Sequence, residues 1–456
     1  MIPVQKNKEY IVDIIDDGIS GEGIAKIEDY TIFIKGAIKE EKVKALIIKV
    51  NKSYAYGKIV EIIKESPNRI LSDCSTYKRC GGCDLRHIKY EETLLIKQKT
   101  VQNLVNKSLK NKILVEQTIG MEIPYNYRNK AIYPVGYDKN KNIIMGVFAN
   151  RSHEIVNCNE CLIQNKKSEE IANYIIEFMK KNKVTAYNEK DNTGLVRHII
   201  IKIGIKTEEI MCIIVTNGDK FAKKEELVNE LIQQFPNIKT IVQNINTKNT
   251  NVVLGENNKI LYGNGTITDK LGEYKFEISP LSFYQVNPIQ TEVLYNKAIE
   301  FANLQKQDIV MDLYCGIGTI GIFVSKYVNN VYGIEIIEQA INNANRNKQL
   351  NNIENIEFYC GEVEKTLEVI LKGQKIVPNV IFVDPPRKGL DDITINNIIK
   401  SKPNKIIYIS CNPATLLRDL RKLEENYYVM KIQPVDMFPF THHVECVAVL
   451  QIKQDM

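Results

Sequence analysis

The last third of the chain alternates short apolar runs with polar segments of helical length, and this alternation constrains the fold more than any other feature. From Asp308 onward four apolar runs of strand length follow one another: IVMDL, VYGIE, VIFVD and KIIYIS. Apolar runs separated by helices are typical of a doubly wound parallel sheet. Such sheets bind ligands at the carboxyl ends of their strands, so the residues that close these runs are candidates for a site.

A glycine-rich turn follows the first run. In YCGIGTIG, Gly316, Gly318 and Gly321 form a G-x-G-x-x-G pattern between an expected strand and an expected helix. Glycines there let the backbone approach a ligand closely and let the helix pack on the sheet. By itself the pattern fits a dinucleotide-dependent oxidoreductase as well as an S-adenosylmethionine site.

Carboxylates end the second and third runs. Glu335 closes VYGIE, where a carboxylate can accept hydrogen bonds from both hydroxyls of a ribose. Asp384 closes VIFVD and is followed by two prolines, which remove backbone donors and stiffen the loop. A rigid loop that holds a carboxylate over the crevice can orient a flat, polar base.

A cysteine follows the fourth run. In SCNPATLLRDL, Cys411 precedes Asn412, which is expected to cap a helix, and Pro413, which is expected at its first position. Because a helix N-terminus lowers the pKa of a thiol, we expect a substantial thiolate fraction on Cys411 near neutral pH.

The spacing of five cysteines indicates a metal centre. Cys74, Cys80 and Cys83 stand as C-x5-C-x2-C, and Cys158 and Cys161 follow in NCNECLIQ. Three close thiolates and a distant one fit an iron-sulfur cluster or zinc, since both take four sulfur ligands. The spacing differs from the C-x3-C-x2-C of radical S-adenosylmethionine enzymes, so we expect a structural role. The other cysteines are predicted to be core residues: Cys212, Cys315, Cys360 and Cys446.

A chain of 456 residues, 44% of them apolar, is expected to form two or three domains. Residues 1–66 read as short alternating strands and predict a small β-barrel. Residues 67–270 predict an α+β domain that holds the cysteines, one helix over EETLLIKQKTVQNLVNKSL and another near 168–181. Residues 271–456 predict an α/β Rossmann-like domain.

Charge and hydropathy narrow the function only slightly. The net charge of +6 is compatible with a polyanionic partner but does not select one. The sequence has no run of eighteen apolar residues and does not begin like a secretory signal, so we expect a cytoplasmic protein with no membrane partner.

The motifs FYQVN, DLYCGIGTIG, FVDPPRKGL, SCNPATL and HHVECVAVL, in this order, resemble the RNA uracil-5 methyltransferases. With the cysteine cluster and the barrel, the resemblance extends over nearly all of the chain. It implies S-adenosyl-L-methionine as the methyl donor and carbon 5 of a uridine as the acceptor. It also implies roles for individual residues: Cys411 as nucleophile, Glu445 as general base, and a cofactor and base pocket lined by Gln285, Tyr314, Gly316, Glu335 and Asp384. Relatives often have Phe where this chain has Tyr314.

The chemistry explains why this reaction needs a thiol and a base. Carbon 5 of uracil is too poor a nucleophile to take a methyl group from a sulfonium, but attack of the Cys411 thiolate on carbon 6 creates an enolate that can do so. Glu445 is then the candidate to remove the carbon 5 proton, so that elimination releases the cysteine. A stacked base must be flipped out to reach the pocket. His442 and His443 are expected to serve packing or RNA contact.

The resemblance also extends to the N-terminal half. It implies a [4Fe-4S] cluster on Cys74, Cys80, Cys83 and Cys161, with Cys158 spare. The barrel resembles a TRAM domain, an OB-like RNA-binding module in which Tyr54 and Tyr56 are candidates for stacking on bases or for barrel packing. Barrel, cluster and methyltransferase together resemble the enzymes that act on 23S ribosomal RNA more than the bacterial transfer-RNA enzymes, although some archaeal transfer-RNA enzymes have a cluster. We expect a monomer.

Three other functions stay open at this point. The first is a tRNA uracil-5 methyltransferase, although the bacterial enzymes of this kind usually lack the barrel and the cluster. The second is a catalytically inactive RNA-binding or ribosome assembly protein, which intact Cys411 and Glu445 argue against. The third is an NAD-linked oxidoreductase with an iron-sulfur cluster, which would leave the Asp-Pro-Pro loop, Cys411 and Glu445 without a purpose.

Overall fold

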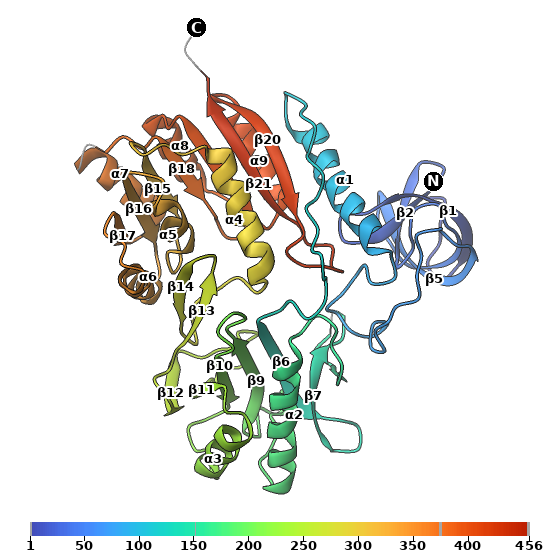
Figure 1. The fold of residues 1–456 in the computed structure, drawn as a ribbon. Helices are drawn as coiled ribbons and strands as arrows, with labels where there is room; N and C mark the ends of the chain where they lie inside the picture. Colours follow the sequence, from blue (N-terminus) through green and yellow to red (C-terminus); the bar gives the residue numbers. More distant parts are fainter. Residues whose placement is uncertain (1, 151, 374–375, 454–456) are drawn as a thin grey trace.

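A small barrel forms the N-terminus of the computed structural model, which describes residues 2–150, 152–373 and 376–453 (Figure 1). The strands follow the order β1-β2-β3-β5-β4 and pair antiparallel, except that β3 and β5 run parallel. They are β1 (Glu9–Asp17), β2 (Glu22–Ile27), β3 (Tyr30–Lys35), β4 (Lys42–Val50) and β5 (Tyr54–Lys64). Alternate side chains such as Ile32, Ile34 and Ile47 fill the interior, which confirms the predicted barrel.

Helix α1 (Tyr90–Ser108) follows the barrel in the sequence, and it lies where its apolar spacing predicted a helix. Its residues Val101 and Val105, with Leu109 just beyond its end, are fully buried in a core shared with the C-terminal sheet. The helix therefore packs on the C-terminal unit, although it follows the barrel in the sequence (Figure 1).

The central unit is a seven-stranded sheet in the order β12-β11-β10-β9-β6-β7-β8, antiparallel apart from the pair β10 and β11. Its strands are β6 (Lys130–Tyr137), β7 (Ile143–Phe148), β8 (Ile155–Asn157), β9 (Val196–Ile203), β10 (Ile210–Thr216), β11 (Ile238–Ile245) and β12 (Asn257–Tyr262). Helices α2 (Lys166–Lys181) and α3 (Lys224–Gln234) contribute to the same core as Ile199, Ile201 and Cys212. This confirms the predicted α+β unit and its helix near residue 168.

The C-terminal unit is a second seven-stranded sheet, in the order β17-β16-β15-β18-β19-β21-β20. Five neighbouring strands run parallel, and β21 runs antiparallel to both β19 and β20. The strands are β15 (Ile309–Leu313), β16 (Asn330–Glu335), β17 (Ile356–Cys360), β18 (Val380–Val383), β19 (Lys405–Ser410), β20 (Tyr427–Val435) and β21 (Glu445–Ile452). The helices are α4 (Pro288–Ala302), α5 (Thr319–Ser325), α6 (Glu338–Leu350), α7 (Val363–Gly373), α8 (Asp392–Ser401) and α9 (Pro413–Leu423). The predicted Rossmann-like α/β fold is confirmed.

A short hairpin joins the two large sheets. Strands β13 (Ile267–Leu271) and β14 (Tyr274–Ile278) contribute to one core with Ile213 of the central sheet and Ile322 of α5. The predicted boundary between residues 270 and 271 falls inside β13, and the domain limits stay predictions. Among the described residues, no helix is long and apolar enough to span a bilayer.

Candidate active site

The ends of four parallel strands meet at one edge of the C-terminal sheet. Leu313 pairs with Ile334 on one side and with Val383 on the other, and Val383 pairs with Tyr408. The residues that follow these positions therefore share one rim, as the alternation of strands and helices predicted. They are Tyr314, Glu335, Asp384 and, past the end of β19, Cys411.

The turn after β15 has a backbone that only its glycines adopt without strain. Gly316 and Gly318 have φ values of 55° and 81°. A Cβ atom on Gly318 would lie 2.6 Å from the Phe358 ring, whereas one on Gly316 would meet no heavy atom within 4 Å. Gly318 thus serves packing of the turn, and Gly316 borders open space that a ligand can fill.

Tyr314 has a positive φ of 67°, which is rare for an aromatic residue. Backbone strain of this kind collects at ligand-binding sites, where the surrounding structure holds it in place. The half-buried Tyr314 ring packs against the apolar core. The sequence motif contained this residue, but its pattern did not signal the strain.

The Glu335 carboxylate is fixed beside the glycine turn. It accepts hydrogen bonds from the backbone N–H groups of Gly316, at 3.2 Å, and Ile337, at 3.0 Å. A carboxylate has about four acceptor positions, so Glu335 retains capacity for the hydroxyls of a ribose.

A second acidic residue, Asp312, is buried beneath the turn. Its Oδ2 accepts a hydrogen bond from the Gly321 N–H at 2.8 Å. Burial, with Asp384 and Glu335 nearby, raises the pKa of Asp312 to about 8. Sequence analysis did not select Asp312, although an acidic residue inside an apolar strand is itself a signal of a site.

Asp384 lies at the start of a loop that is bound to helix α9. Its backbone N–H donates to the Leu313 carbonyl at 3.3 Å, and burial raises the pKa of its carboxyl to about 7. Further along the loop, the Arg387 carbonyl accepts hydrogen bonds from Asn412 and Thr415, each at 3.2 Å. Asn412 also caps α9 and Pro413 is its first residue, which confirms both predictions.

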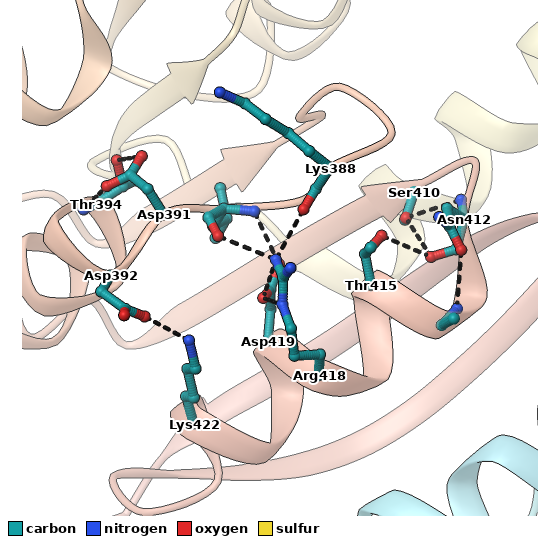
Figure 2. Close-up of polar contacts among 12 residues, drawn as sticks. Lys388, Asp391, Asp392, Thr394, Ser410, Asn412, Thr415, Arg418, Asp419 and Lys422 are labelled. Carbon is teal, nitrogen blue, oxygen red and sulfur yellow. Dashed lines mark hydrogen bonds and ion pairs between the residues drawn. The ribbon is translucent and has the colours of Figure 1, made fainter.

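Arg418 and Asp419 complete the attachment of this loop to α9 (Figure 2). Arg418 donates to the carbonyls of Lys388, at 2.8 Å, and Leu390, at 3.1 Å. The buried Asp419 carboxylate accepts from the Leu390 N–H at 2.8 Å and from the Tyr408 hydroxyl at 2.7 Å. The Asp384 loop and the turn that carries Cys411 are therefore fixed to the same helix. Sequence analysis missed both side chains, because nothing local distinguishes them from helix surface residues.

Cys411 and Glu445 face each other across neighbouring strands. Ser410 at the end of β19 pairs with Cys446 of β21, so the next residues along the two strands, Cys411 and Glu445, stand opposite each other. Glu445 is 3% exposed, and burial followed by the Asp384 charge raises its pKa to about 8. The thiol and the carboxyl are thus in reach of one bound base.

The expected low pKa of Cys411 is wrong for this structure. Burial, followed by the charges of Glu445 and Asp384, raises the pKa of the thiol to about 11. The Arg387 charge acts in the opposite direction but is outweighed. Position before a helix was the only signal in the sequence, whereas the carboxyls come from other strands. Arg387 stood in the quoted Asp-Pro-Pro-Arg motif, but sequence analysis gave it no role.

Gln285 lies in the segment before α4. Asn129 holds its backbone, since the Asn129 amide donates to the Gln285 carbonyl at 2.9 Å and the Asn129 N–H donates to the Val286 carbonyl at 2.9 Å. Asn287 caps α4 and donates to the Met437 carbonyl at 3.1 Å. In the described part of the chain, no hydrogen bond joins the Gln285 side chain to the other predicted site residues.

A groove of about 1650 Å3 lies between the barrel and the cysteine loop. Its lining includes Tyr56 and Lys58 of the barrel, the cysteine loop, and His442 and His443, which come shortly before Glu445 in the sequence. Its volume exceeds the roughly 300–1,000 Å3 of small-molecule pockets and suits a polymer.

The aromatic residues predicted to contact RNA or to pack have contacts of their own. Tyr54 and Tyr56 are half-buried and contact each other with ring centroids 5.5 Å apart. His442 Nδ1 lies 2.6 Å from the Asp84 carboxylate.

The five clustered cysteines come together around strand β7. Cys80 forms a β-bridge with Ala149 just after β7, and β8, which leads to Cys158, pairs with β7. The Thr76 hydroxyl lies 3.4 Å from the Cys74 sulfur and 3.6 Å from the Cys158 sulfur. Within the described ranges, however, no three His, Cys, Asp or Glu side chains have the arrangement that would hold a metal ion.

The other cysteines follow the prediction with one exception. Buried positions are found for Cys212, Cys315 and Cys446. Cys360 is exposed, so its predicted place in the core is wrong. It ends β17, the edge strand of the C-terminal sheet, where one side of the strand has no neighbouring strand.

Comparison with known proteins gives a methyltransferase family for most of the chain and a separate domain for its N-terminus. Residues 89–453 match the family model of the tRNA (uracil-5-)-methyltransferases, and residues 3–60 match that of the TRAM domain. The chain is 46% identical to a protein named uncharacterized RNA methyltransferase from Clostridium tetani, over 98% of this chain and 97% of that protein. A protein of the same name from Staphylococcus epidermidis is 43% identical over the whole of both chains.

A solved structure shares the whole architecture. It is the crystal structure of Pyrococcus abyssi tRNA (uracil-54, C5)-methyltransferase in complex with S-adenosyl-L-homocysteine. The two structures superpose with a TM-score of 0.78 over 96% of this chain and 99% of that chain, at 27% identity.

Proposed function

The chain belongs to the tRNA (uracil-5-)-methyltransferase family, whose members methylate carbon 5 of uracil in RNA with S-adenosylmethionine. From this premise we propose that the protein methylates its uridine through a covalent adduct between Cys411 and the base. One observation carries the proposal: Cys411, the residue after β19, and Glu445, the first residue of β21, adjoin the paired residues Ser410 and Cys446 and stand opposite each other. A nucleophile and a base on the same side of a base pocket are what the two halves of this reaction need.

In the first half, the Cys411 thiolate attacks carbon 6 of the uracil, and a sulfur–carbon bond forms while the ring becomes an enolate. Carbon 5 of that enolate then takes the methyl group, and the sulfonium leaves as a neutral thioether. In the second half, the Glu445 carboxylate removes the carbon 5 proton, the sulfur–carbon 6 bond breaks, and the thiolate returns.

The glycine turn and its neighbours are the proposed site of the methyl donor. Open space above Gly316 and the fixed carboxylate of Glu335 support a bound nucleoside at this point. We assign Tyr314, Gln285 and Asp384 to the same pocket, with Asp384 beside the base. The donor supplies the methyl group, while these residues bind and orient it.

We propose 23S ribosomal RNA as the substrate, bound along the groove from Tyr56 to His443. Aromatic rings and lysines beside each other suit a single strand of RNA. The combination of barrel, cysteine cluster and methyltransferase supports ribosomal RNA. The similarity to an archaeal tRNA (uracil-54, C5)-methyltransferase over nearly the full length favours transfer RNA as a second candidate.

We also propose that Cys74, Cys80, Cys83 and Cys161 hold a [4Fe-4S] cluster. Cys83 and Cys161 pack against one small apolar cluster, which supports Cys161 as the fourth ligand. In such a cluster each thiolate binds a different iron, so the sulfurs need not converge on one point as the ligands of a zinc ion must.

The monomeric state and the cytoplasmic location of the protein remain predictions. Sedimentation at twice the chain mass would contradict the monomeric state.

Trapping with 5-fluorouridine tests both the mechanism and the substrate. The protein is incubated with S-adenosylmethionine and with 23S ribosomal or transfer RNA transcripts in which 5-fluorouridine replaces uridine. Fluorine at carbon 5 cannot leave as a proton, so we expect a methylated RNA–protein adduct in denaturing gels with ribosomal RNA.

The Cys411→Ala variant is the control and should give no adduct. An adduct with transfer RNA alone would replace ribosomal RNA by the second candidate. Absence of an adduct with every RNA, despite binding of S-adenosylmethionine, would reject the covalent mechanism.

A further inference from the structure

The segment of residues 436–444 connects β20 to β21 and ends immediately before Glu445. Val435, the last residue of β20, pairs with Glu445, the first residue of β21. Asp436 is therefore the first residue beyond the strand pair that carries the proposed base. Strand pairs fray at their ends unless something holds them.

A buried ion pair holds this end. Lys97 Nζ of α1 lies 2.6 Å from Asp436 Oδ1, and the two side chains are 1% and 0% exposed. Lys97 also donates to the Phe438 carbonyl at 3.2 Å, and the Tyr90 hydroxyl donates to Asp436 Oδ2 at 2.8 Å. Both oxygens of the carboxylate thus have a donor from helix α1.

Other contacts fix the backbone around the pair. Gln290 donates to the Asp436 carbonyl at 3.1 Å, and the N–H groups of Asp84 and Leu85 donate to the Phe440 carbonyl at 3.1 and 3.0 Å. The first five residues of the 436–444 segment are therefore held by α1, by α4 and by the cysteine loop. The contact from α1 uses two almost fully buried charges, whereas the ion pair between His442 and Asp84 is partly exposed.

A buried ion pair adds little stability, because desolvation of both charges opposes their attraction. The ion pair instead restricts geometry, because one arrangement of the two side chains is favoured over the others. Here the constrained group is the residue next to the pairing partner of Glu445. Cys411 depends on different contacts, since Ser410 and Asn412 bind each other beside it and α9 follows.

We infer that Lys97 and Tyr90, acting through Asp436, are positioning residues that hold the Glu445 carboxyl over carbon 5 of the adduct. The inference rests on the proposed role of Glu445. Loss of the contact moves the base and leaves the nucleophile in place. It therefore slows release of the methylated RNA much more than it slows formation of the adduct.

The test measures the two halves of the reaction separately in single turnovers. Trapping on RNA with 5-fluorouridine reports the first half. The covalent fraction on RNA with ordinary uridine reports slow release. The variants are Tyr90→Phe, which removes the hydrogen bond to Asp436 together with the one that the Tyr90 hydroxyl accepts from the Met121 N–H, and the double variant Lys97→Met with Asp436→Asn, which leaves no unpaired buried charge.

We expect both variants to trap 5-fluorouridine RNA within about threefold of the wild type, and to release methylated RNA more slowly. A displacement of about 1 Å can cost on the order of a hundredfold in a positioned reaction, so the double variant should slow release at least tenfold. Methylated RNA–protein adduct should then accumulate on ordinary RNA, which a general loss of folded protein does not produce.

A matched control comes from the barrel. Tyr30→Phe removes a hydroxyl that donates to the Asn51 carbonyl at 2.6 Å, and Tyr30 begins strand β3. This control should not accumulate adduct.

The Glu445→Gln variant tests the assignment of Glu445 as the base separately from the positioning role of Tyr90 and Lys97. If it accumulates adduct and the Tyr90 and Lys97 variants do not, the positioning role is overturned and the base assignment stands. If Glu445→Gln accumulates none, the base assignment falls, and the positioning role falls with it. Equal losses in both half-reactions for Tyr90→Phe, the milder variant, would likewise overturn the positioning role.

Discussion

At the scale of single residues, the protonation of the site decides how the reaction starts. Burial raises the pKa of Cys411, and the charges of Glu445 and Asp384 raise it further. The free protein therefore keeps the thiol protonated at neutral pH. Arg387 is the cation that opposes this effect, and RNA binding has to favour the thiolate further.

The rate of adduct formation should depend on pH in one direction. With a pKa of about 11 for Cys411, the thiolate fraction rises as pH rises, by roughly tenfold per unit well below the pKa. We expect single-turnover trapping of 5-fluorouridine RNA to accelerate between pH 6.5 and 9 without reaching a plateau. Arg387→Met should lower the rate throughout this range. A rate independent of pH from 7 to 9 would show that the bound state already holds the thiolate.

At the scale of elements, the rim of the C-terminal sheet depends on turns that bring backbone close to ligand. Gly316 and Gly318 share a left-handed backbone but differ in what surrounds them. One borders open space, whereas the other contacts an aromatic ring of β17. The same motif therefore contains a glycine for binding and a glycine for packing.

Substitution of the two glycines should separate these roles. Gly318→Ala should cost about 3 kcal/mol of stability, from left-handed strain and overlap with Phe358, and lower the melting temperature by roughly 2–4 °C per kcal/mol. Gly316→Ala should cost only about 1–2 kcal/mol but weaken S-adenosylmethionine binding in calorimetry, because its methyl group enters the ligand space.

Gly36→Ala in the barrel is the control for backbone strain alone, since its φ is 77° and no heavy atom lies within 4 Å of the added carbon. A Gly316→Ala variant that binds the methyl donor as tightly as the wild type would contradict the assignment of this turn.

At the scale of the whole molecule, the cysteine loop lies between the barrel and the 436–444 segment. Asp84 and Leu85, which follow Cys83, bond to the Phe440 carbonyl, and the Arg86 guanidinium lies 4.3 Å from the centre of the Phe440 ring. The loop also lines the groove that starts at the barrel. The conformation of the cysteine loop therefore affects both the groove proposed to bind RNA and the 436–444 segment before Glu445.

Substitution of single cysteines should identify the fourth ligand of the proposed iron-sulfur cluster. In protein purified without oxygen, Cys161→Ser should lose most of its iron and sulfide and the broad visible absorption of the cluster, whereas Cys158→Ser should keep them. Cys212→Ser, a buried cysteine in the central sheet, controls for the loss of a thiol from a core. Iron loss in Cys158→Ser alone would exchange the two assignments, and zinc without sulfide in the wild type would reject the cluster.

The sequence by itself determined the features that depend on a few neighbouring residues. The glycine turn, the Asn412 cap with Pro413, helix α1 and the alternation of the barrel strands follow from local backbone preferences and periodicity. The shared rim of Glu335, Asp384 and Cys411 also followed, because all parallel strands end at the same edge of a sheet.

Only the tertiary structure decided which distant groups meet. β21 lies between β19 and β20, and this order brings Glu445 opposite Cys411. Burial of the thiol, followed by the charges of Glu445 and Asp384, reverses the expected shift in its pKa. Lys97 and Asp436 are 339 residues apart, and no local pattern connects them. Such contacts depend on how complete apolar faces pack, which is a property of the whole chain, whereas the local preferences of a segment are already contained in its own residues.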